Sequence, residues 1–259
     1  MKKIRIVRKG FLGTRIIERD LPTRWSDLSE KQFILIAKSV SDDLPDDIFF
    51  SQLLDLSSHS LPSYFIYKLS DYLSFLQSDE GVDRFFMHRL HDTDMYSPGI
   101  RLKGMTFEQF MHVDTMFNRY MHKMTDDNLN MFVANLYIRR CECFVLPERE
   151  KNSLFSFRKM KLLQPADNAR YIAKRVDKHV KFAVFLNYVL IKKWLSTSFP
   201  FLFPESGDNV STGRHGKINI PSVKWLDIFD SFVGDDIAKM DYYLSLIHIS
   251  EPTRLQLIS

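Results

Sequence analysis

Hydrophobic and polar residues alternate near the N-terminus, in two short runs on either side of a glycine-bordered break. Residues 4–8 and 14–19 place aliphatic side chains between charged ones, and a period of two is typical of strands with one buried face. Gly10 and Gly13 border the break. The pattern predicts a β-hairpin over residues 1–22. Because a lone hairpin is marginally stable in water, it must rest on the helices or on another chain.

Two later segments share a residue order that begins helices. In each, a Ser or Thr follows an apolar residue and precedes Gln and Phe at the third and fourth positions, which suits a capping box with a hydrophobic staple. These residues are Leu28, Ser29, Gln32 and Phe33 in the first segment, and Met105, Thr106, Gln109 and Phe110 in the second. A looser third copy begins at Met124. We interpret all three as structural helix caps, which need no functional explanation.

Apolar residues recur at helical spacing after these starts, and they predict a series of helices. One helix is expected after Ser29 and another from Pro62 onward. The others are expected over Asp46–Leu56, Val82–Leu90, Phe107–Met121, Asp126–Tyr137, Pro165–Trp194 and Ser222–Val233. Residues 95–104 are expected to form a loop. The stretch Phe182–Ile191 is apolar on most sides, so either it is deeply buried or the long helix breaks near Lys181.

The predicted fold is mainly α, a multi-helix globular bundle with a short N-terminal β-hairpin. Only 9 glycines and 10 prolines are present, which disfavours a sheet with many tight turns. The expected organisation is a hairpin over 1–22, a helical lobe over 23–138, an irregular connection over 139–164, a C-terminal helical lobe over 165–243 and a non-native tail over 244–259.

The tail is expected to be foreign to the protein. Leu244 to Ser259 read LSLIHISEPTRLQLIS, which resembles the conceptual translation of a transposase-type sequencing adapter followed by an index and a primer. Such a segment carries no information about the fold. We therefore expect the natural sequence visible here to end near Tyr243, with the natural C-terminus missing.

The composition is that of a globular protein with an aromatic core, at 45% hydrophobic and 26% charged residues with 22 phenylalanines. Cys141 and Cys143 are too few for a disulfide framework. The N-terminal segment lacks the apolar region of a signal peptide, and the longest apolar stretch is shorter than the ~20 residues of a membrane span. We expect a cytoplasmic protein that does not enter the membrane.

Charge is distributed unevenly along the chain. Residues 41–94 carry eleven acidic and three basic residues, a net charge of −8, whereas residues 139–193 carry fourteen basic and five acidic residues, a net charge of +9. Two explanations are open. The two halves attract each other as solvated surfaces, or the basic half binds an acidic partner, protein or nucleic acid.

Motifs for catalysis, nucleotides or metals do not emerge. The segment Gly213–Lys217 lacks the first glycine and the Ser or Thr that a phosphate-binding loop requires. The pairs His88 with His91, and Glu108 with His112, do not have metal-site spacing. No serine stands in a nucleophile elbow. We expect no cofactor and no enzymatic activity, and no catalytic residue is nominated.

A dense run of basic residues gives the chain a candidate binding surface. Its members are Arg158, Lys159, Lys161, Arg170, Lys174, Arg175, Lys178 and Lys181. On one continuous helix, positions 170, 174, 178 and 181 share a face that could neutralise phosphates or bind a protein partner. Nucleic-acid binding by this helix is the alternative function that the sequence suggests.

The segment from Leu21 to Phe33 resembles the opening of small proteins encoded in the tail-assembly gene clusters of tailed phages and prophages. These proteins carry a strand pair and then Leu-Pro-x-x-Trp-x-x-Leu-(Ser/Thr)-x-x-Gln-Phe. Trp25, Leu28, Gln32 and Phe33 carry that match.

A second element extends the resemblance to about half of the natural chain. Ile100–Phe110, followed by Asn135–Tyr137, is similar to the central segment of these proteins, whereas Cys141–Leu146 stands where they have a Pro-containing loop. The resemblance implies a non-enzymatic chaperone or accessory factor. It implies binding to a tail protein such as the tape-measure protein, in the host cytoplasm or on the virion.

Overall fold

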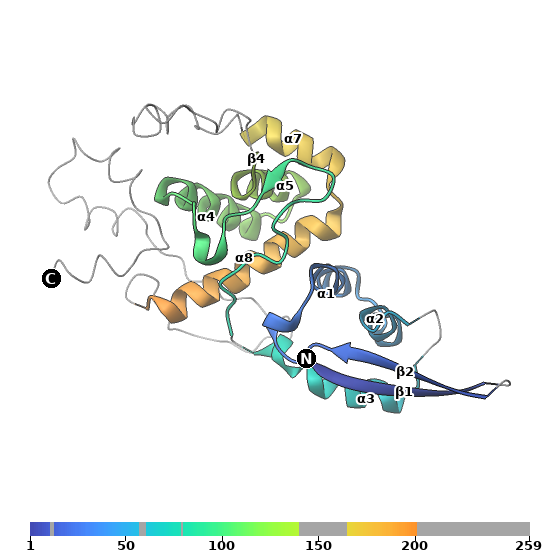
Figure 1. The fold of residues 1–259 in the computed structure, drawn as a ribbon. Helices are drawn as coiled ribbons and strands as arrows, with labels where there is room; N and C mark the ends of the chain where they lie inside the picture. The colour runs from blue at the N-terminus through green and yellow to red at the C-terminus, as the bar shows by residue number, and fades with distance from the viewer. Residues whose placement is uncertain (11–12, 57–60, 79, 140–164, 201–259) are drawn as a thin grey trace, which may run out of the picture.

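The computed structural model describes residues 1–10, 13–56, 61–78, 80–139 and 165–200, and this part of the chain has the predicted mainly α fold. Its helices are α1 (Glu30–Asp42), α2 (Asp46–Leu53), α3 (Ser63–Ser70), α4 (Phe107–His122), α5 (Asp126–Leu136), α7 (Pro165–Arg175) and α8 (Lys178–Ser198). The long helix α8 crosses the middle of the molecule (Figure 1). Helices α4, α5 and α7 lie on one side of it, and α1, α2 and the N-terminal strands lie on the other.

The predicted N-terminal hairpin is confirmed. Strand β1 (Lys2–Gly10) pairs antiparallel with β2 (Gly13–Leu21), and Ile6 lies opposite Ile17 in the register. Ile6 and Leu21 are buried against the helices, which supplies the support that a two-stranded sheet needs. The distal half of both strands extends beyond α2 and α3 (Figure 1).

An aromatic cluster packs the segment that follows the hairpin onto the helical body. Trp25 lies in a short 3-10 turn, and its ring packs edge-on against Phe33 of α1 and Phe75, with centroid distances of 6.4 Å and 5.3 Å. Phe33 in turn stacks on Phe86 at 4.2 Å. Leu28 is also buried. Of the residues that carry the phage-protein resemblance, Trp25, Leu28 and Phe33 are therefore core residues, and Gln32 takes part in the cap of α1.

The first helix cap has the predicted reciprocal geometry. Ser29 Oγ accepts a hydrogen bond from the backbone N–H of Gln32 at 3.3 Å, and the Gln32 side chain accepts from the Ser29 N–H at 3.0 Å. Both hydrogen bonds satisfy donors that a helix start leaves without partners.

The second cap forms only in part. Thr106 Oγ1 accepts from the Gln109 N–H at 3.2 Å, but the Gln109 side chain donates to the carbonyl of Asn135 at 3.3 Å. The predicted reciprocal box at Thr106 is therefore wrong, because Gln109 is buried against α5 and its amide serves that contact instead. Thr125 caps α5 by accepting from the Asn128 N–H.

The long predicted helix is two helices. Helix α7 ends at Arg175 and α8 begins at Lys178, because Asp177 has extended backbone and its carboxylate accepts from the His179 N–H at 2.7 Å as an N-cap. The break thus lies before Lys181. The apolar stretch of α8 is deeply buried, with Val184, Tyr188 and other positions inaccessible to solvent.

Residues 82–90 do not form the predicted helix. The Val82 N–H donates to the Leu190 carbonyl at 3.1 Å, and the Phe86 N–H donates to Asn187 Oδ1 at 2.8 Å. Their backbone groups are satisfied by α8, so this segment runs irregularly along that helix. The expected loop after it contains a two-residue strand, β3 (Met95–Tyr96), which pairs with β4 (Ile138–Arg139).

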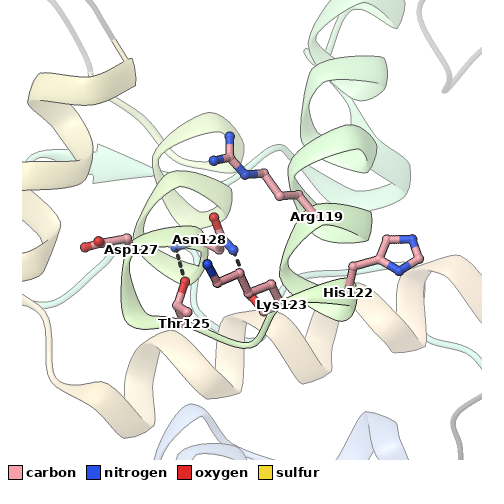
Figure 2. A pocket seen from close by; sticks show the side chains of 6 residues that line it. All are labelled: Arg119, His122, Lys123, Thr125, Asp127 and Asn128. Atoms are coloured by element: carbon pink, nitrogen blue, oxygen red, sulfur yellow. Dashed lines mark hydrogen bonds between the residues drawn. The ribbon is translucent and has the colours of Figure 1, made fainter.

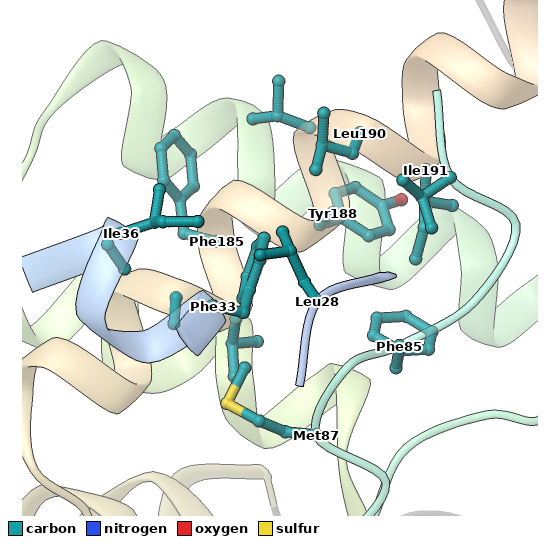
Figure 3. Packing of buried hydrophobic residues seen from close by; sticks show 14 of the residues in the cluster. Leu28, Phe33, Ile36, Phe85, Met87, Phe185, Tyr188, Leu190 and Ile191 are labelled. Atoms are coloured by element: carbon teal, nitrogen blue, oxygen red, sulfur yellow. The ribbon is translucent and has the colours of Figure 1, made fainter. Parts of the chain in front are cut away.

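The core is rich in aromatic residues, as the composition predicted. Phe117 of α4 stacks on Phe185 of α8 at 5.4 Å, and Phe132 of α5 meets Tyr188 of α8 edge-on at 5.3 Å. Figure 3 shows Phe33 from α1 and Phe185 from α8 in the same packed cluster. The hydrophobic core thus continues from the hairpin to α8.

Several predicted features lie outside the described residues. These are residues 140–164 of the expected connection, the helix expected over Ser222–Val233, and the tail 244–259. Among the helices that the structure describes, none combines the length and the apolar character needed to cross a membrane.

Candidate interaction surfaces

The predicted basic helix face is divided by the structure. Arg158, Lys159 and Lys161 lie outside the described residues. Because the helix is interrupted between α7 and α8, positions 170 and 174 belong to a different helix from positions 178 and 181. The prediction that these four positions share one helix face is therefore wrong.

Lys181 is buried rather than exposed. Only 7% of the residue is accessible, and its ammonium donates to Asn130 Oδ1 of α5 at 3.0 Å. A buried ammonium must be hydrogen-bonded to be tolerated, so Lys181 fastens α8 to α5 and is not exposed for binding a partner.

Other residues of the predicted basic stripe, the run of basic residues between Arg158 and Lys181, form contacts within the protein. Arg170 pairs with Asp167 at 3.4 Å, and the Arg175 guanidinium lies 4.9 Å from the centre of the Tyr171 ring. Lys178 pairs with Asp42 of α1 at 3.2 Å. Lys174 is exposed at the end of α7. The described part of the stripe is thus partly neutralised by the protein itself.

The junction of α1 and α8 joins the acidic and basic parts of the chain. Asp42 Oδ2 lies 2.6 Å from His179 Nε2, while His179 Nδ1 lies 2.9 Å from Asp177. The hydrogen bond from His179, with help from Lys178, lowers the pKa of Asp42 to about 2. A further pair joins Asp94 and Arg139 at 3.4 Å. These contacts support mutual attraction between the two halves.

The most deeply buried charges lie between α4 and α8. Lys192 Nζ is 2.7 Å from Asp114 Oδ1, with side-chain exposures of 5% and 0%, and Asn118 donates to the other Asp114 oxygen at 3.3 Å. The Lys192 ammonium also lies 5.1 Å from the centre of the Phe117 ring. Burial and the negative charge of Asp114 raise the pKa of the neighbouring Tyr188. Because solvent is excluded, we interpret this cluster as part of the core.

An open hollow of about 560 Å³ lies at the turn between α4 and α5 (Figure 2). It is lined by Arg119, His122, Lys123, Thr125, Asp127 and Asn128. The Asn128 backbone N–H and side-chain amide already bond to Thr125 Oγ1 and to the Lys123 carbonyl. The basic side chains lie at the C-terminal end of α4, where they suit the negative end of the helix dipole. We therefore interpret the residues of this hollow as part of the helix end.

Metal ligands do not gather in the described part of the chain. No group of three or more His, Cys, Asp or Glu side chains is placed there to hold an ion. Glu108 and His112 approach each other at 3.9 Å on the exposed face of α4. Cys141 and Cys143 lie outside the described residues.

The hairpin carries an exposed apolar pair that the sequence analysis did not single out. Val7 and Ile16 lie directly opposite each other in the register and are 57% and 63% exposed. Arg5 and Glu18 form an ion pair at 2.7 Å at the next outward-facing position. Strand alternation carries the signal: Ile6 is buried and Ile17 packs partly buried on the core, so their neighbours Val7 and Ile16 lie on the opposite face.

A second exposed apolar surface lies on α3. Tyr64 and Tyr67 are 69% and 70% exposed. The Lys68 ammonium lies 4.6 Å from the centre of the Tyr64 ring, and the Lys2 ammonium lies 4.0 Å from that of Tyr72. Tyrosine is enriched at protein interfaces, so α3 is a second candidate binding surface.

Comparison with known proteins gives no relative for this chain: no family model, no curated protein and no solved structure matches it.

Proposed function

We propose that this protein is a non-enzymatic accessory factor of phage or prophage tail assembly that acts by binding another protein. The tape-measure protein is the candidate partner, and the site of action is the host cytoplasm or the virion. The proposal draws on the likeness of Trp25, Leu28, Gln32 and Phe33 to proteins of tail-assembly gene clusters. That likeness includes a strand pair ahead of the first helix.

The observation that carries the binding role is the apolar pair on the outward face of the hairpin. Val7 and Ile16 expose most of their surface on an element that extends beyond α2 and α3 (Figure 1). Two-stranded sheets leave unpaired backbone groups at their edges, and exposed apolar residues beside such edges favour association with another chain. The exposed tyrosines of α3 support the same conclusion.

Nucleic-acid binding by the basic residues around 158–181 has less support. Lys181 is buried, and Arg170 and Lys178 are paired with carboxylates. A phosphate-binding stripe requires several unpaired cations on one surface. We therefore favour the protein-binding role.

Co-expression tests the proposal. The full chain is produced together with the tape-measure protein encoded in the same tail cluster, and complex formation is measured by co-purification and size-exclusion chromatography. We expect a stable complex that the double variant Val7→Asp/Ile16→Asp loses. The matched control is Val40→Asp, because Val40 is a 61% exposed aliphatic residue on α1. Absence of a complex, or equal loss in the control, would contradict the proposal.

A further inference from the structure

The outer edge of β1 is open in the described structure. Strands β1 and β2 bond to each other, and neither makes a backbone–backbone hydrogen bond to any other described segment. Strand β2 is nevertheless fastened at its edge: Arg19 Nε donates to the Leu54 carbonyl at 2.9 Å, and Arg19 Nη2 donates to the Asp55 carbonyl at 3.3 Å. Strand β1 is held near its start, where the Lys2 ammonium donates to the Tyr72 hydroxyl at 2.5 Å. From Lys3 onward its outer edge bonds to no other backbone of the described structure.

Charge determines which strand would fit there. Residues 2–9 contain five basic residues and no acidic residue. Two copies of β1 side by side would bring like charges together across the new pair, which is destabilising. An acidic strand would instead face opposite charges.

We infer that the open edge of β1 accepts, as a third strand, an extended protein segment of alternating acidic and apolar residues. This inference rests on the proposed protein-binding function and names the chemistry of the partner. Lys3 and Arg5 are exposed on the outward face, whereas Ile4 and Ile6 on the opposite face are packed on the core. Acidic residues of the added strand lie beside Lys3 and Arg5, and apolar residues extend the Ile4–Ile6 row.

The same face is poorly suited to nucleic acid. A nucleic acid lacks the strand-spaced backbone N–H and C=O groups that pair with a strand edge, and it has no aliphatic side chains to extend the Ile4–Ile6 row. The exposed aliphatic side chains of Val7 and Ile16 also provide no charge or hydrogen-bond donor for phosphates.

Synthetic peptides test the inference on the full chain. The probe is a fluorescent peptide of alternating glutamate and valine, compared with a block-ordered peptide of the same composition and with a peptide of alternating lysine and valine. We expect the alternating glutamate peptide to bind at least about tenfold tighter than either comparison peptide by fluorescence anisotropy. We also expect slower hydrogen exchange of the β1 amides when it is bound.

Backbone methylation of the peptide supplies an arm that needs no protein variant. Methyl groups on alternate nitrogens remove the donors from one edge of the peptide only. We expect one alternating set to weaken binding by about tenfold and the other set to change it by less than about twofold. Equal effects of both sets would overturn strand addition.

Charge reversal on the protein gives a complementary test. Lys3→Glu/Arg5→Glu should lose the glutamate peptide and gain the lysine peptide. The control Lys31→Glu, an exposed lysine of α1, should bind as the unmodified chain does. Equal binding of the block-ordered peptide, tighter binding of duplex or single-stranded DNA, or unchanged exchange in β1 would each overturn the inference. If the peptide tests fail but the chain still binds the tape-measure protein, the inference fails and the proposed function stands. If the peptide binds but the tape-measure protein does not, the proposed function fails and the inference stands.

Discussion

Asp114 and Lys192 form a salt bridge of 2.7 Å that closes the core between α4 and α8, and neither side chain is more than 5% exposed. Removing one charge leaves the other buried without compensation, which costs about 3–5 kcal/mol. We therefore expect Asp114→Ala to lower the free energy of unfolding by roughly that amount in urea titrations monitored by circular dichroism.

The reciprocal experiment separates charge burial from packing. The double variant Asp114→Leu/Lys192→Met replaces both charges with apolar groups and should regain most of the stability lost by Asp114→Ala. Arg170→Ala is the exposed control, because its pair with Asp167 is 81% and 62% accessible, and it should change stability by less than about 1 kcal/mol. Equal losses in all three proteins would contradict this account.

Local signals made much of the fold predictable. The hairpin follows from alternation in residues 4–8 and 14–19, and α1, α4 and α5 begin at the predicted caps, because a cap is an interaction between residues three or four positions apart. Residues 82–90 were predicted wrongly because their backbone partners, Leu190 and Asn187, are distant in the sequence. An apolar periodicity alone cannot reveal such partners.

The candidate surfaces were predictable only in part. The basic stripe assumed that one helix continues through Asp177, although an Asp before a helical segment is itself an N-cap signal. Burial of Lys181 could not be read from its position, because it depends on Asn130 of α5. The exposure of Val7 and Ile16 followed from alternation once the buried face of the hairpin was known.

Gly81 is required where the chain crosses α8. A Cβ atom at this position would lie 2.0 Å from the Trp194 backbone nitrogen and 2.4 Å from its Cα. Backbone must shift to relieve such a clash, so we expect Gly81→Ala to lower the free energy of unfolding by about 1–3 kcal/mol or more. Gly99→Ala is the matched control, since its nearest contact would be the Lys103 Cβ at 3.2 Å. A Gly81→Ala protein as stable as that control in thermal unfolding would refute the requirement.

Acid should weaken the junction between α1 and α8. The folded-state pKa of Asp42 is lowered from 3.8 to about 2 by its hydrogen bond with His179. A depressed carboxyl pKa contributes stability that is fully present above the unfolded pKa and is lost as the pH falls through the folded value. We expect the urea midpoint to fall between about pH 4 and pH 2, and His179→Ala to reduce that dependence.

Two further carboxylates also lose stabilising interactions when the pH falls. The contribution of the junction between α1 and α8 must therefore be measured by comparing variants. The pKa values of Asp27 and Asp177 are also lowered; a hydrogen bond from the N-terminal ammonium is the largest cause at Asp27, and hydrogen bonds from His179 outweigh partial burial at Asp177. Thr23→Ala removes one partner of Asp27 and leaves the His179 junction intact. If His179→Ala and Thr23→Ala show the same pH profile as the unmodified chain, the junction does not contribute to acid sensitivity.

Lys181 and Lys174 distinguish a structural from a nucleic-acid-binding role for the basic residues. Lys181 donates to Asn130 inside the protein, whereas Lys174 is exposed on α7. Lys181→Ala leaves a buried acceptor unsatisfied and should cost about 1–3 kcal/mol of stability, whereas Lys174→Ala should remain within about 0.5 kcal/mol. Urea unfolding measures both changes.

A phosphate-binding surface predicts a different result for Lys181→Ala, namely a change in DNA binding. Each lost phosphate contact reduces the salt dependence of DNA affinity by about one unit of slope. Titration of duplex DNA at two salt concentrations therefore completes the test: a reduced slope in Lys181→Ala, together with unchanged stability, would place Lys181 on the binding surface and contradict its burial against α5.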